Sequence, residues 1–187
     1  MRATLDFLLN DWLGVSSLLA RLRFADHSAE TFNSVLDTCE RIAREKFAPF
    51  NRLADTQEPR VVDGPDGARV HLPASTHAAM AAYVDSGMLA AAQAYEDGGM
   101  QLPCVIEMAA NAFFSKASVA MGGYAMLTSG NANLLMAHGT ALQREVFALN
   151  LFSGRWFGTM CLSEPQAGSS LSDVATRAVP DGADFEA

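Results

Sequence analysis

The chain has 187 residues, of which 50% are hydrophobic and 18% are charged, and it carries a formal net charge of −8. This composition is typical of a folded globular protein and argues against a disordered one. Its only lysines are Lys46 and Lys116, and the sequence contains no basic cluster. It therefore predicts no nucleic-acid partner and no basic amphipathic helix on a membrane.

The cysteines and the least polar stretch of the chain bear on its location. Cys39, Cys104 and Cys161 are far apart and show neither a disulfide pattern nor a metal-binding spacing, so we expect a reducing, cytoplasmic location and no metal site. Residues 117–143 contain no Lys, Arg, Asp or Glu. Glycines, asparagines and a histidine interrupt this stretch, which favours packed core helices joined by a turn over a membrane span.

The first half of the chain is predicted to be helical. Residues 4–22 are expected to form one or two short helices. Residues 28–50 form the clearest predicted helix, because apolar residues recur there at steps of three and four. Ser28 suits the N-cap of this helix, and Pro49 is expected to end or kink it. Residues 61–73 read as a turn-rich connector with room for a short hairpin.

Further helices are predicted downstream, with residues 95–103 as a loop between them. The predicted helices cover residues 73–87, 104–121, 131–139 and 141–154. From Trp156 onward the pattern changes to short strand-like runs. We therefore predict a mainly α chain, with an N-terminal helical domain of about six helices over residues 1–156. The first strands of a β domain are expected to follow over residues 157–187.

The segment from residue 160 to residue 170 has a composition that suits a ligand. Met160 to Leu162 can form a strand, and Ser163 then offers a hydroxyl at the end of that strand. Gly168 keeps the chain thin, so that a bulky ligand can approach the backbone. The N–H groups around it can form a concavity for a phosphate or pyrophosphate. An ordinary surface loop between strands is the alternative.

Three stretches carry a resemblance to a known family. The string CLSEPQAGSS at residues 161–170 resembles the motif Leu-Thr-Glu-Pro-x-Ala-Gly-Ser-Asp of the acyl-CoA dehydrogenase family. The string YEDGGMQLP at residues 95–103 is similar to the family's Tyr-Gly-Gly-x-Gly-x loop, and residues 137–165 are similar to its helix-to-strand passage. The strings LDFLLNDWL and GTMCLSEPQAGS look most like the branch that includes 3-methylmercaptopropionyl-CoA dehydrogenases.

This resemblance implies a FAD enzyme that desaturates an acyl-CoA between its α and β carbons. It also implies an electron-transfer flavoprotein as partner and a homo-oligomeric assembly. By position, the backbone near Met160 and Leu162 and the hydroxyl of Ser163 would face the flavin ring. Gly168 and Ser169 would approach the pyrophosphate, and Ser169 would also lie beside the entrance for CoA. In this chain Ser163 replaces the family's threonine, which conserves a hydroxyl.

The resemblance assigns no catalytic residue to this chain, because the family's catalytic glutamate lies in a C-terminal helical bundle that the chain lacks. Glu164 is expected to be a structural carboxylate beside a turn, and Glu107 a paired core or interface carboxylate. Ser170 stands where the family usually has aspartate. A truncated, non-catalytic module that binds flavin, acyl-CoA or a partner is therefore an alternative. A flavin monooxygenase or nitroalkane oxidase of the same fold is another.

Overall fold

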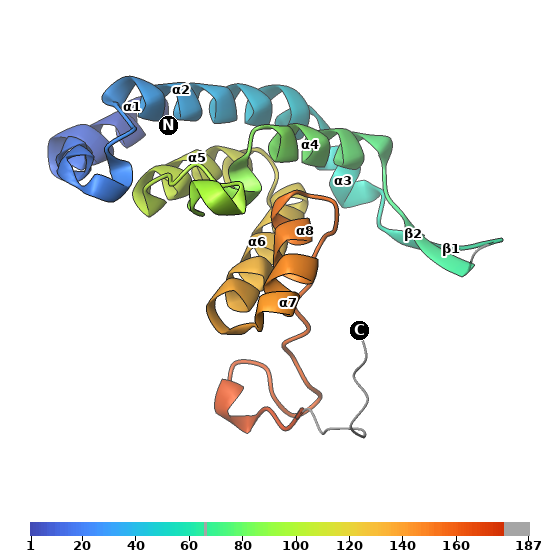
Figure 1. Cartoon of the computed structure of the whole chain (residues 1–187). Coiled ribbons are helices and arrows are strands. Elements are labelled where there is room, and N and C mark those ends of the chain that lie inside the picture. The colour runs from blue at the N-terminus through green and yellow to red at the C-terminus, as the bar shows by residue number, and fades with distance from the viewer. Residues whose placement is uncertain (66, 178–187) are drawn as a thin grey trace.

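The computed structural model describes residues 1–65 and 67–177 of the chain. Helices make up most of these residues, and the one sheet among them is a two-stranded hairpin (Figure 1). The mainly α class predicted from the sequence is therefore confirmed. No helix in the described part combines the length and hydrophobicity that a membrane span requires.

The N-terminal part consists of short helical turns followed by one long helix. Helix α1 (Arg2–Asp6) runs on through a π-helical turn to Trp12, and two 3₁₀ turns follow. Helix α2 (Ala29–Ile42) begins at Ser28, whose hydroxyl accepts the Thr31 N–H at 3.2 Å while the Thr31 hydroxyl accepts the Ser28 N–H at 2.7 Å. This reciprocal cap confirms Ser28 as the N-cap and satisfies donors that the helix itself leaves free.

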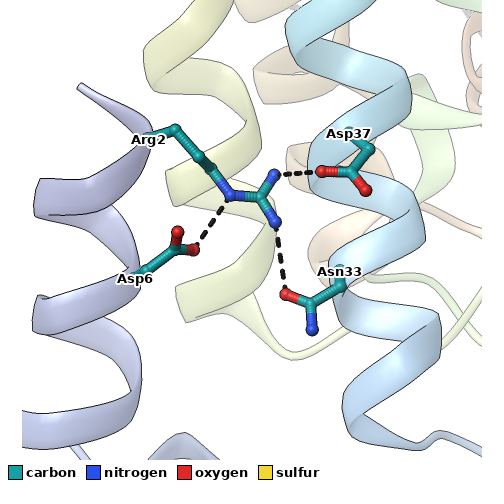
Figure 2. Close-up of polar contacts among 4 residues, drawn as sticks. All are labelled: Arg2, Asp6, Asn33 and Asp37. Atoms are coloured by element: carbon teal, nitrogen blue, oxygen red, sulfur yellow. Dashed lines mark hydrogen bonds and ion pairs between the residues drawn. The ribbon is translucent and has the colours of Figure 1, made fainter.

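The Arg2 side chain on α1 makes polar contacts with α2 (Figure 2). Its Nε donates to Asp6 Oδ1 at 2.9 Å within α1, and its Nη2 donates to Asn33 Oδ1 on α2 at 3.2 Å. Its Nη1 lies 2.7 Å from Asp37 Oδ1, also on α2. The planar guanidinium can serve three acceptors at once because its donors point in fixed, different directions.

Beyond α2 the chain turns twice before the next long helix. A π-helical turn continues α2 to Phe47, Pro49 lies in a 3₁₀ turn, and α3 (Asn51–Thr56) follows. Strands β1 (Arg60–Gly64) and β2 (Gly67–His71) then pair antiparallel, with Arg60 opposite His71. This hairpin projects away from the helices (Figure 1) and its described residues are exposed. The hairpin that the turn-rich connector allowed is confirmed.

The remaining helices differ in one respect from the prediction. Helix α4 (Ala74–Asp85) follows Pro73, as expected. Helix α5 (Cys104–Ala117) ends earlier than predicted, and α6 (Val119–His138) runs unbroken across the predicted helix at residues 131–139. The break falls at Ser118, whose extended backbone leaves the helix and whose hydroxyl accepts the Met121 N–H at 3.4 Å. The Ser118 cap fixes where α6 begins, and the interior glycines do not break the helix because its packing against the other helices outweighs their low helix propensity.

The last helical stretch is one continuous unit. Helix α7 (Ala141–Gln143), a π-helical turn and α8 (Leu149–Phe152) follow each other directly. Two groups of buried residues hold the helices together. The larger one joins α2, α4 and α5, and there the Phe114 ring packs against those of Phe47 and Tyr83. The smaller one joins α6 to α8 through residues Ala132, Leu151 and Phe152.

The strand expected at Met160–Leu162 is not formed, and this part of the prediction is wrong. The segment is irregular, and an isolated bridge between Glu164 and Ala167 is the nearest strand-like pairing. The reason is that a strand needs a neighbour to bond to, and the only described sheet pairs with itself at β1 and β2. Residues 178–187, the end of the range in which the first strands of a β domain were expected, lie outside the described residues. The domain division after residue 156 stays a prediction.

Candidate functional site

The segment after α8 is anchored on α6 before it reaches the motif. Gly158 N–H donates to the Thr128 hydroxyl at 3.1 Å, and the Asn131 side chain donates to the Thr159 carbonyl at 3.4 Å. The Thr128 hydroxyl itself donates to the Tyr124 carbonyl at 2.7 Å. Thr128 is fully buried, so this contact excludes water. Sequence reasoning missed both anchors, because neither residue carries a local pattern that reveals a partner about thirty positions away.

Replacing Thr128 by valine should release residues 158–159 from α6, since valine keeps the branched shape of the threonine side chain but lacks its hydroxyl. The Gly158 N–H would lose its acceptor, and we expect a loss of about 1–2 kcal/mol in the free energy of unfolding. Urea unfolding measures this loss, and exchange of the Gly158 amide proton locates it. Thr56 is the control, because its exposed hydroxyl donates to the Arg52 carbonyl within its own helix. An equal loss for the Thr56→Val variant would contradict the anchor.

A tight turn follows at Glu164–Ala167. The Ala167 N–H donates to the Glu164 carbonyl at 3.1 Å, and the Glu164 N–H donates to the Ala167 carbonyl at 2.8 Å. Pro165 occupies the second position of this turn, where its fixed φ is favourable. Ala167 is 1% exposed, whereas the residues on either side of the turn are exposed. The turn therefore contains the buried, packed residue of a loop whose neighbouring residues are exposed to solvent.

The Glu164 side chain belongs to this loop. Its Oε2 accepts the Ala175 N–H at 2.9 Å and a donor from the Gln166 amide, and its Oε1 accepts the Thr176 N–H at 2.8 Å. Hydrogen bonds from the Thr176 side chain and from the backbone N–H groups of Ala175 and Thr176 lower the pKa of the Glu164 carboxyl to about 2. The prediction of a structural carboxylate beside a turn is confirmed.

The structure places all five predicted cofactor residues on this open loop. Met160 and Leu162 expose 56% and 48% of their surface, and Ser163, Gly168 and Ser169 are exposed as well. Within residues 1–65 and 67–177, the hydroxyls of Ser163 and Ser169 have no hydrogen-bond partner. A side chain added at Gly168 would meet no atom within 4 Å. Their contact with a flavin stays a prediction.

Backbone donors are also free in the middle of the loop. The N–H groups of Gly168, Ser169 and Ser170 make no hydrogen bond within the described part of the chain. Successive free N–H groups on an exposed loop form the kind of donor set that binds a phosphate or pyrophosphate. Together with the two free hydroxyls, they give the loop donors and acceptors without a formal charge.

A second polar group lies in the helical core, away from this loop. The Tyr83 hydroxyl on α4 donates to Asn111 Oδ1 on α5 at 2.7 Å, and burial, assisted by the charge of Glu107, raises the Tyr83 pKa. Burial also raises the pKa of the Glu107 carboxyl. No cation pairs with Glu107 in residues 1–65 and 67–177. The pairing expected for Glu107 in the core is thus not found there, and an interface role for Glu107 stays a prediction.

The described residues hold no group of three or more His, Cys, Asp or Glu residues that could bind a metal ion. Burial raises the pKa of the Cys39 thiol to about 12, which keeps it protonated and unreactive. Cys104 and Cys161 are exposed and unpaired with each other. The polar loop after α8 is therefore the strongest candidate site in the part of the chain that the structure describes.

The chain is similar in sequence to known enzymes. The chain is 34% identical over 172 residues to 3-methylmercaptopropionyl-CoA dehydrogenase of Ruegeria pomeroyi. The matched region covers 92% of this chain and 28% of that protein. It is 30% identical over 173 residues to a broad-specificity linear acyl-CoA dehydrogenase of Mycobacterium tuberculosis. This matched region covers 92% of this chain and 28% of that protein. No protein-family model matches the chain.

A butyryl-CoA dehydrogenase of Syntrophomonas wolfei is 27% identical over 179 residues, or 94% of this chain and 29% of that protein. The chain is therefore a sequence relative of the acyl-CoA dehydrogenases, as its motifs predicted. The relatives include a 3-methylmercaptopropionyl-CoA dehydrogenase, the branch that the motifs indicated. The chain spans 28–29% of the length of these relatives.

Proposed function

We propose that this chain is the N-terminal portion of a FAD-dependent acyl-CoA dehydrogenase, which desaturates an acyl-CoA thioester between its α and β carbons. The observation that carries the proposal is the open loop at residues 160–170. It presents free hydroxyls and free N–H groups at the motif that the family uses for its flavin. The printed names of the relatives, all acyl-CoA dehydrogenases, support it.

The residues of the loop fit a dinucleotide cofactor. When bound, FAD would supply the acceptor for the hydride that leaves the β carbon. The Ser163 hydroxyl would hydrogen-bond the flavin ring, beside the backbone of Met160 and Leu162, and would help to set the ring's electronics. The free N–H groups at Gly168 and Ser169 would bind the pyrophosphate. Ser169 would also border the entrance for CoA.

The base that removes the α-proton is proposed to come from a C-terminal helical bundle outside this chain. Glu164 is unsuited to the task, because its oxygens already accept hydrogen bonds from Gln166, Ala175 and Thr176. A carboxylate with a pKa of about 2 is also a weak proton acceptor near neutral pH. We further propose a cytoplasmic homo-oligomer that passes its electrons to an electron-transfer flavoprotein.

One observation favours a second candidate function. Ser170 replaces the aspartate of the family motif, and its side chain makes no hydrogen bond in the described part of the chain. A truncated module that binds flavin or acyl-CoA without turnover would tolerate that change. The chemistry of a flavin monooxygenase or a nitroalkane oxidase is a variant of the first proposal, since the same fold carries both.

The proposal predicts a difference between this chain and the product of its complete reading frame. The 187-residue chain should retain little or no FAD and reduce no dye with any acyl-CoA, because the base and most flavin contacts are proposed to lie elsewhere. The longer product should be yellow, with one FAD per chain, and should reduce a dye when acyl-CoA is added. Absorbance of the purified proteins near 450 nm and a dye-reduction assay measure both expectations.

Two outcomes would contradict the dehydrogenase proposal. A reading frame that stops after residue 187 would favour the non-catalytic module for this polypeptide. A longer product that binds FAD but transfers no electrons from any acyl-CoA would favour the other flavoenzyme chemistries. A Ser163→Ala variant of the longer product serves as the matched check on the site, because it removes the proposed flavin hydrogen bond without changing charge. Its FAD affinity should fall about tenfold.

A further inference from the structure

The Glu164 carboxylate connects two parts of the loop that are distant in sequence. It lies in the turn at residues 164–167, and it accepts the N–H groups of Ala175 and Thr176, which are 11 and 12 positions further along. The Gln166 amide donates to the same carboxylate from within the turn. One side chain thus joins the start of the loop to its end.

The other hydrogen bonds in this segment are local. The Leu171 N–H donates to the Ser169 carbonyl at 3.1 Å, and the Asp173 N–H donates to the Ser170 carbonyl at 3.0 Å. Among the described residues, every hydrogen bond between residues 164–167 and residues 174–177 ends on the Glu164 carboxylate, including one from the Thr176 side chain. Packing contributes little as well, since Ala167 is the one buried residue of the described segment 160–177. The shape of the loop therefore depends on Glu164.

We infer that Glu164 is a positioning residue that closes residues 164–176 into a ring and so holds the N–H groups of Gly168 and Ser169 in place for an anionic cofactor. The ring itself is seen in the hydrogen bonds, and its use for FAD rests on the proposed function. A preformed donor set binds more tightly than a mobile one, because ordering costs less on binding.

The carboxylate suits this role better than an amide would. Its two oxygens accept at several lone pairs, which suits the donors that converge on it from Gln166, Ala175 and Thr176. A glutamine in its place would keep one accepting oxygen and would turn its NH₂ group toward backbone N–H groups that also donate. An aspartate would keep both oxygens on a side chain one methylene shorter. Glu164→Gln therefore tests the need for a carboxylate, and Glu164→Asp tests the need for the length of the glutamate side chain.

The test compares Glu164→Gln and Glu164→Asp with Asp173→Asn as the matched control. Asp173 lies in the same loop, is exposed, and has a carboxylate without a partner among the described residues, so its amide variant makes the same charge change without opening the ring. In the 187-residue chain, hydrogen exchange at the Ala175 and Thr176 amides should accelerate about tenfold or more in Glu164→Gln. It should accelerate less in Glu164→Asp and stay unchanged in Asp173→Asn.

The second readout is FAD affinity of the same variants in the product of the complete reading frame, measured by quenching of flavin fluorescence. The Kd should rise about tenfold for Glu164→Gln, recover in part for Glu164→Asp, and stay unchanged for Asp173→Asn. Unchanged amide exchange in Glu164→Gln would overturn the ring. Faster exchange with unchanged FAD affinity would overturn the positioning role toward the cofactor. If the unsubstituted longer product binds no FAD at all, the proposed function fails while the exchange data still decide the ring.

Discussion

Replacement of Phe114 by alanine is expected to lower the free energy of unfolding by about 3–5 kcal/mol. Phe114 is 2% exposed and lies on α5 at the meeting point of three elements. Its ring centroid is 5.0 Å from that of Phe47 at the end of the α2 stretch and 4.8 Å from that of Tyr83 on α4. Truncation removes buried apolar surface and leaves a cavity that the surrounding helices fill only in part.

Urea unfolding followed by the helical circular dichroism signal measures this loss. Phe7 is the matched control, because it is 56% exposed in the N-terminal π-helical turn. The Phe7→Ala variant should change stability by no more than about 0.5 kcal/mol. If the two variants lose the same amount, Phe114 is not the centre of the core, and the packing of α2, α4 and α5 around it would need another explanation.

The helix that the sequence predicted best is the one whose signals agree at every level. For α2 the apolar repeat and the Ser28 cap agree on where the helix begins, and the helical stretch that follows ends in the 3₁₀ turn that contains Pro49, as the proline predicted. In the stretch from Cys104 to His138 the signals conflict. Interior glycines argue for breaks, while Ser118 argues for a single new start. Helix α6 begins at the Ser118 cap and continues through its glycines, because tertiary packing that no local pattern shows outweighs their low helix propensity.

The sequence predicted the features of the candidate loop that depend on neighbouring residues, and it missed those that depend on residues far away in the chain. The turn at Pro165 and the structural role of Glu164 follow from neighbouring residues, because a turn is closed by residues three positions apart. The strand at Met160–Leu162 was wrong, because strand formation depends on a partner elsewhere in the chain. The partners of Glu164 at Ala175 and Thr176 were also beyond sequence reasoning. Backbone N–H groups are present at nearly every residue and leave no pattern.

Replacement of Gly99 by alanine is expected to destabilise the chain by about 3 kcal/mol. A side-chain carbon at this position would collide with the Gln93 carbonyl and lie 2.6 Å from the Ala90 carbonyl oxygen. Both obstacles are backbone atoms, which cannot turn aside as a flexible side chain can. Gly99 N–H also donates to the Ala94 carbonyl at 2.9 Å, so the backbone here is held in place. Thermal and urea unfolding measure the effect.

The matched control is Gly130→Ala in α6, where a side-chain carbon would meet nothing within 4 Å. Because alanine favours the helix, this variant should gain about 0.5–1 kcal/mol. If Gly99→Ala lowers the stability and Gly130→Ala raises it, the loop at residues 95–103 needs glycine at position 99 because a larger residue does not fit there. Its neighbour Gln101 has a positive φ of 49°, and His27 Nε2 lies 2.9 Å from the Met100 carbonyl oxygen. A tolerated Gly99→Ala variant would mean that this loop yields despite those contacts.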